Sequence, residues 1–98
     1  MKRIIEGKTY NTDTATLVAD WDNGKFSNDF NYAYENLYIT KKGQFFITGN
    51  GCFINGYLDG NEMCRDMLLL SEAAALKWCE YRSIEPDLIS TYLKTEEG

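Results

Sequence analysis

The 98-residue sequence contains no histidine, and this absence excludes several kinds of chemistry. Ser-His-Asp and Cys-His catalysis need an imidazole base, and many zinc sites need imidazole ligands. The three cysteines, Cys52, Cys64 and Cys79, are widely spaced and form no C-x-x-C pair. Neither a disulfide framework nor a four-cysteine zinc site is therefore expected, and the thiols should be reduced. We predict a protein that is not an enzyme and has no metal or cofactor.

Long apolar runs are also missing. No stretch approaches the length that crosses a bilayer, and residues 1–7 lack the apolar segment of a secretory signal. We therefore expect a cytoplasmic protein with no membrane partner. Only one proline is present, while 44% of the residues are hydrophobic and 14% are aromatic, which excludes disorder and collagen. A chain of this length forms one domain, 1–98, and not two.

The N-terminal third predicts a short strand followed by a short helix. Residues 2–5 favour the strand, and residues 11–14 offer N-cap candidates for the helix. Leu17, Val18 and Trp21 stand at i, i+1 and i+4, which is one helical face. Asp22-Asn23-Gly24 should end this helix, because Asn-Gly favours positive φ. A polar loop is then expected over residues 25–29.

The centre of the chain carries the strongest strand signal. Residues 32–40 and 44–48 are rich in aromatic and aliphatic side chains, and Lys41-Lys42-Gly43 is short enough to join them as a hairpin. Leu37 and Ile39 should point to one face and Tyr38 to the other. Because both faces of the second strand are apolar, we expect helices on one side of the sheet and partial shelter on the other.

The C-terminal half predicts a loop or irregular hairpin over residues 49–61, a strand over 66–70 and two helices. Ser71 is a good N-cap for a helix over 72–82, and Pro86 suits the first turn of the next helix. Leu88, Ile89, Tyr92 and Leu93 form one apolar face of that helix. The predicted fold is an α+β domain: an antiparallel sheet of three to four strands, a short N-terminal helix and two C-terminal helices.

Charge is distributed unevenly along the chain. The net charge is −5, and positive and negative side chains cancel over residues 1–58, so the whole excess belongs to residues 59–98. This excess is typical either of a surface that docks on the basic groove of another protein, as a nucleic acid would, or of an ordinary solvated face. The acidic balance opposes direct binding to nucleic acid, for which only Lys41 and Lys42 lie near the central aromatic residues.

Three segments resemble small proteins encoded by phages and mobile elements of bacteria, among them anti-CRISPR proteins. They are Ile5-Glu6-Gly7-Lys8-Thr9-Tyr10-Asn11-Thr12-Asp13-Thr14-Ala15, the hairpin from Leu37 to Phe46, and the alanine-rich helix that contains Trp78. The resemblance implies a protein in the bacterial host cell that binds a CRISPR effector, often at its site for target DNA. It transfers no functional residue, because the shared segments contain no catalytic or target-binding motif.

The leading hypothesis is therefore a non-enzymatic inhibitor that binds a CRISPR effector through an acidic surface that mimics nucleic acid and blocks target DNA. Each carboxylate would accept hydrogen bonds from Arg or Lys in place of a phosphate oxygen. The alternative is a structural or regulatory protein of a mobile element that self-associates through Tyr38 and Phe46, so that the chain is a monomer or a homodimer. The candidate partner-binding residues are Asp59, Glu62, Asp66, Glu72, Glu80, Glu85 and Asp87, with Tyr57 and Tyr81 as aromatic anchors.

Overall fold

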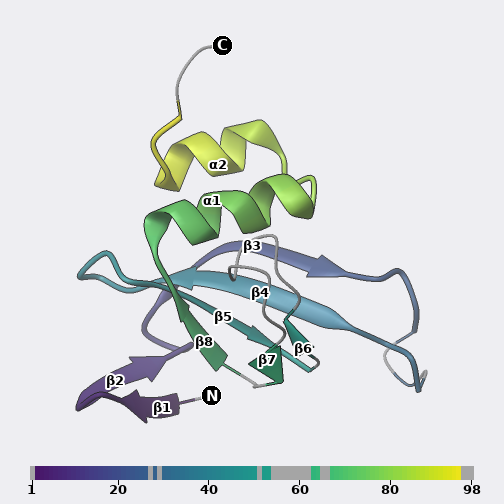
Figure 1. Cartoon of the computed structure of the whole chain (residues 1–98), viewed down its shortest axis with the longest axis horizontal. Helices are drawn as coiled ribbons and strands as arrows, with labels where there is room; N and C mark the ends of the chain where they lie inside the picture. Colours follow the sequence, from purple (N-terminus) through teal and green to yellow (C-terminus); the bar gives the residue numbers. More distant parts are fainter. Residues whose placement is uncertain are drawn as a thin grey trace.

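A four-stranded antiparallel sheet organises the fold, and two helices lie over one of its faces (Figure 1). The computed structural model describes residues 2–26, 28, 30–50, 52–53, 63–64 and 67–95. The sheet has the strand order β3-β4-β5-β8, and two-stranded sheets are formed by β1 with β2 and by β6 with β7. The elements are β1 Lys2–Ile5, β2 Lys8–Asn11, β3 Thr16–Asp22, β4 Tyr34–Ile39, β5 Phe45–Gly49, β6 Cys52–Phe53, β7 Met63–Cys64, β8 Met67–Leu70, α1 Glu72–Tyr81 and α2 Pro86–Tyr92.

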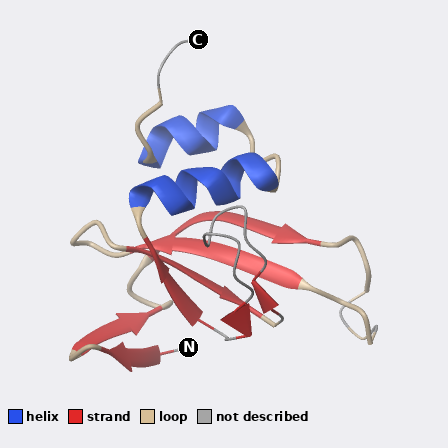
Figure 2. Ribbon diagram, viewed as in Figure 1, coloured by secondary structure: helices blue, strands red, loops and turns tan. Residues whose placement is uncertain are grey.

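The predicted α+β class and the two C-terminal helices are confirmed, but the predicted N-terminal helix is wrong. Residues 16–22 form β3, the edge strand that pairs with β4 (Figure 2). Leu17 opposes Tyr38 and Ala19 opposes Leu37, so Val18 is the extra residue of a β-bulge. The bulge buries Val18 and Ala19 in succession and breaks the alternation of a regular strand. The apolar spacing consequently imitates a helical face.

The central hairpin forms as predicted, although its first strand is shorter than 32–40 and its second strand begins and ends one residue later than 44–48. β4 pairs with β5, and Tyr38 opposes Phe46. Gly43 has a φ of 89°, in the left-handed region that the turn requires and that glycine occupies without strain. The amide of Gly43 donates to the carbonyl of Thr40, which closes the turn.

Each face of the sheet has its own apolar core. On the helical face, Leu37, Phe45 and Ile47 pack with Trp78 and Cys79 of α1. On the opposite face, Phe46 packs with Tyr10 of β2, and the β1–β2 hairpin shelters that side. The two faces predicted from the alternation of residues 37–39 and 45–47 are therefore confirmed.

Both helices begin as their cap residues predict. The Oγ atom of Ser71 accepts a hydrogen bond from the amide of Ala74 at 3.1 Å, which satisfies one free donor at the start of α1. Pro86 occupies the first turn of α2, where its missing N–H costs nothing. α1 packs over β5 and β8, and α2 packs over β3. Most of the predicted 49–61 loop, and Asp66 at the start of the predicted last strand, lie outside the described residues.

Candidate protein-binding surface

The turn between α1 and α2 brings four of the predicted partner-binding residues to one end of the helical layer. Glu80 and Tyr81 belong to the last turn of α1, and Glu85 and Asp87 stand at the start of α2. All four are exposed to solvent. The two helix ends are joined by residues 82–85, so these side chains share the same end of the molecule (Figure 1). We call these four residues the α1–α2 junction.

Glu72, another predicted partner-binding residue, does not belong to this group. It begins α1, about 13 Å from Tyr81 at the rise of an α-helix. Its Oε1 atom faces the amide of Lys94, at 3.5 Å, where the chain leaves α2. Glu72 therefore lies at the other end of the helical layer. The remaining predicted residues, Tyr57, Asp59, Glu62 and Asp66, lie outside the described residues.

The junction carboxylates have no cationic partner in the described part of the chain. Neither Glu80 nor Glu85 nor Asp87 forms an ion pair there. Arg82, the cation next to them in sequence, is instead directed inward to Glu35, with Nε 2.8 Å from Oε1. The positive charge of Arg82 is therefore matched by a buried carboxylate, and no other described cation forms an ion pair with the junction carboxylates.

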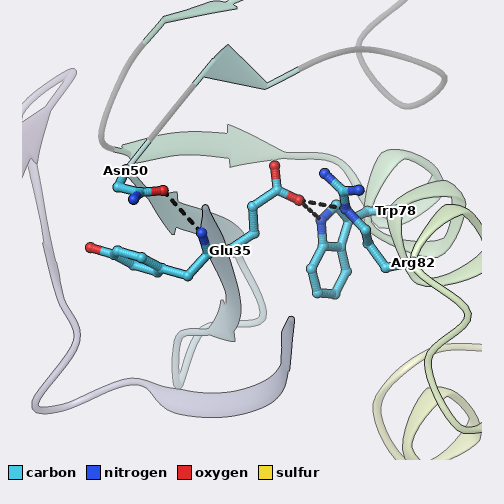
Figure 3. Close-up of polar contacts among 5 residues, drawn as sticks. Glu35, Asn50, Trp78 and Arg82 are labelled. Atoms are coloured by element: carbon cyan, nitrogen blue, oxygen red, sulfur yellow. Dashed lines mark hydrogen bonds and ion pairs between the residues drawn. The ribbon is translucent and has the colours of Figure 1, made fainter. Parts of the chain in front are cut away.

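Glu35 is buried on the helical face of β4, and its carboxylate connects the sheet to α1 (Figure 3). Its Oε1 atom accepts a hydrogen bond from Nε1 of Trp78 at 2.8 Å as well as the one from Arg82. Trp78 and Arg82 are four residues apart and therefore lie on one face of α1, so both reach the same oxygen. The two donors satisfy hydrogen-bonding capacity that a buried carboxylate would otherwise lose on leaving water.

Two aromatic rings flank the guanidinium of Arg82. Its Cζ atom lies 3.6 Å from the ring centre of Trp21 and 4.6 Å from that of Tyr81. Trp21 stands directly opposite Glu35 in the β3–β4 register. These cation–π contacts and the ion pair together hold Tyr81 at the junction although 55% of its surface remains exposed. Tyr81 is thus an exposed ring that is held in place at the junction.

Sequence reasoning missed two exposed phenylalanines in the connection between β3 and β4. Phe26, within the predicted polar loop of residues 25–29, is 83% exposed, and Phe30, just after that loop, is fully exposed. Asn23 braces this connection: its amide donates to the carbonyl of Ala33, and its Nδ2 atom donates to that of Asn31 at 2.7 Å. Aromatic side chains, phenylalanine included, are enriched at the cores of protein interfaces. The signal for these exposed rings in the sequence was the presence of two phenylalanines within a run of polar residues.

Two other residues that carry reactive or aromatic side chains, Phe46 and Cys79, are buried in the interior. Phe46 is fully buried, its ring stacked on Tyr38 at 5.2 Å, so the predicted contact between two copies through Phe46 is wrong for the folded chain. Cys79 is a free thiol with no exposed surface, and burial raises its pKa to about 11. A thiol in that state is a packing group and not a nucleophile.

No helix in the described residues combines the length and the apolar character of a membrane span. Comparison with known proteins gave no match: no family model, no curated protein and no solved structure is significantly similar to this chain.

Proposed function

We propose that this chain is a non-enzymatic inhibitor that uses the α1–α2 junction to bind the basic nucleic-acid groove of a partner protein. The partner class that we propose is a CRISPR effector, and the consequence of binding is loss of access for target DNA. The observation that carries the proposal is that the Arg82 side chain points inward and pairs with Glu35. Among the described residues, Glu80, Glu85 and Asp87 are therefore left without a cationic partner. Carboxylates in this state can accept hydrogen bonds from arginine and lysine in place of phosphate oxygens.

The aromatic residues support binding to a protein surface. Tyr81 lies within the junction, and Phe26 and Phe30 are exposed in the loop that follows β3. Free energy of binding concentrates on a few aromatic and arginine contacts, whereas rim charges mainly set the association rate and the choice of partner. We therefore assign steering to the carboxylates and anchoring to the rings.

The first experiment measures binding to a panel of purified CRISPR effector complexes, together with competition against target DNA. The expected result is one effector that binds the chain, with an affinity that falls as salt increases, because steering between exposed charges is screened beyond about 8 Å at physiological ionic strength. If no effector binds, or if the affinity is the same at low and high salt, the proposal is wrong.

A matched pair of triple variants tests the location of the surface. E80Q/E85Q/D87N removes three charges from the junction, and E6Q/D13N/D20N removes three exposed charges from the β1–β2 turn, the turn after β2 and β3. Exposed charge contacts of about 0.5–1 kcal/mol each correspond to a roughly ten- to hundredfold weaker Kd for the first variant. The second variant should bind nearly as well as the original chain. Equal losses for both would show a general charge effect and contradict a junction-centred surface.

A further inference from the structure

A second candidate site lies away from the helical layer, between the β1–β2 turn and the β4–β5 turn (Figure 1). The cavity there has a volume of about 500 Å³. Both turns contribute residues, so the site exists only because the β1–β2 hairpin packs on the sheet face opposite the helices. A volume of this size lies in the range of pockets for small molecules, about 300–1,000 Å³.

Positive charge dominates the lining of this cavity. Lys8 comes from β2, and Lys41 and Lys42 come from the β4–β5 turn. None of the three forms an ion pair within the described part of the chain, and no described lining residue is Asp or Glu. In a protein with a net charge of −5, three unpaired lysines around one cavity form a local reversal of sign. Such a reversal favours an anionic ligand.

Neutral donors complete the lining. Tyr10 is 5% exposed, and its ring packs edge-on against Phe46 with the ring centres 5.8 Å apart. Its hydroxyl forms no hydrogen bond with any described residue, which is unusual for a buried polar group. The Oγ1 atom of Thr40 accepts from the amide of Gln44 at 3.1 Å, so the Thr40 hydroxyl hydrogen remains available for a ligand.

We propose that this cavity binds a phosphate-bearing small molecule, of the size of a nucleoside diphosphate, through its phosphate groups. Lysine ammonium groups are compact point charges that bind phosphate, and three of them match the charge of a diphosphate. The hydroxyl groups of Tyr10 and Thr40 supply the uncharged donors to the same oxygens. The inference is independent of the protein-binding function, because no residue of the α1–α2 junction lines the cavity.

Calorimetric titrations at low ionic strength with pyrophosphate, ADP and adenosine test the ligand class. Pyrophosphate and ADP should bind with one site per chain, and adenosine should not bind. A chain with a net charge of −5 is not expected to attract anions non-specifically. Saturable binding of pyrophosphate or ADP would therefore indicate a specific site. Absence of pyrophosphate and ADP binding at millimolar concentration, or equal binding of adenosine and ADP, would overturn the proposal.

Substitutions then test the location. K8Q, K41Q and K42Q should each weaken pyrophosphate binding by about two- to fivefold, and the triple variant should abolish it. K77Q, at an exposed lysine of α1, removes the same charge far from the cavity and should leave binding unchanged. Y10F keeps the ring and its packing, and should weaken binding while the thermal unfolding midpoint stays close to the original. Equal weakening by K77Q and K41Q would refute the site.

Discussion

Nε of Arg82 lies 2.8 Å from Oε1 of Glu35, although the two residues are 47 positions apart in sequence. This pair joins the end of α1 to the middle of the sheet. It also decides the charge of the α1–α2 junction, because it turns inward the cation that would otherwise offset the neighbouring carboxylates. Stability and the proposed binding surface therefore depend on the same contact.

The first prediction concerns the stability that this buried carboxylate provides. Glu35→Ala should lower the free energy of unfolding by about 3–5 kcal/mol, because it leaves Arg82 and Nε1 of Trp78 without their acceptor. Glu35→Gln should cost less, about 1.5–3 kcal/mol, because an amide oxygen still accepts from Trp78. Urea denaturation followed by tryptophan fluorescence measures both variants. A Glu35→Ala variant within about 0.5 kcal/mol of the original chain would contradict a structural role for the pair.

The second prediction is a dependence of stability on alkaline pH that comes from Cys79. Its pKa in the folded chain is about 11, raised above the ordinary value of 9.0 by burial. The unfolded chain therefore loses the thiol proton first, so the contribution of Cys79 to stability should be fully present below pH 9 and should fall as the pH rises from 9 through 11. Burial also raises the pKa of Tyr38, which contributes with the same sign.

A comparison with Cys79→Ala isolates the thiol. Between pH 7 and 11, the free energy of unfolding of this variant should decline less steeply than that of the original chain. Deprotonation of Tyr38 contributes to the decline that remains. In a C52S/C64S background, Ellman's reagent should react with Cys79 at pH 8 only when the chain is unfolded. Rapid reaction of the folded chain would mean that the thiol is accessible.

The local sequence pattern was sufficient to predict the β4–β5 hairpin and both helices, but it was not sufficient to predict β3. The alternation over residues 35–39 places Glu35 on the same face as Leu37 and Ile39, so its burial under the helices was available from the pattern that predicted the strand. The bulge at Val18 could not be predicted from the local pattern, because it depends on pairing with β4, a strand more than ten residues away. Non-local pairing decides such cases and leaves no periodic signal.

Only the acidic composition of the candidate surface could be predicted from the sequence. The excess of acidic residues in the C-terminal half is visible in the sequence, but their grouping depends on how α1 turns into α2. Separation of Glu72 from Glu80 follows from the length of α1, whereas the inward direction of Arg82 requires Glu35 from another element. The cavity between Lys8 and Lys41 was likewise not predicted, since it arises where two distant turns meet.

The third prediction concerns the turn of the central hairpin. Gly43 has a φ of 89°, and a Cβ atom added there would have no neighbour within 4 Å. The cost of Gly43→Ala is therefore purely conformational, about 1–2 kcal/mol, and Gly43→Asn should cost less because asparagine tolerates this region. Thermal denaturation of the two variants shows which of them is less stable. An alanine variant as stable as the original chain would show that the turn adopts another conformation in solution.

The last prediction separates partner binding from folding at the exposed phenylalanines. The double variant F26S/F30S should unfold at nearly the same denaturant concentration as the original chain, because Phe26 and Phe30 bury little or no surface. Its affinity for the partner should fall tenfold or more if the two rings are anchors, since an interface aromatic residue contributes about 1 kcal/mol or more. As a control, Phe46→Leu alters a fully buried ring and should lower stability while leaving the affinity of the remaining folded molecules unchanged. A double variant that binds as tightly as the original chain would confine the binding surface to the α1–α2 junction and remove the loop from it.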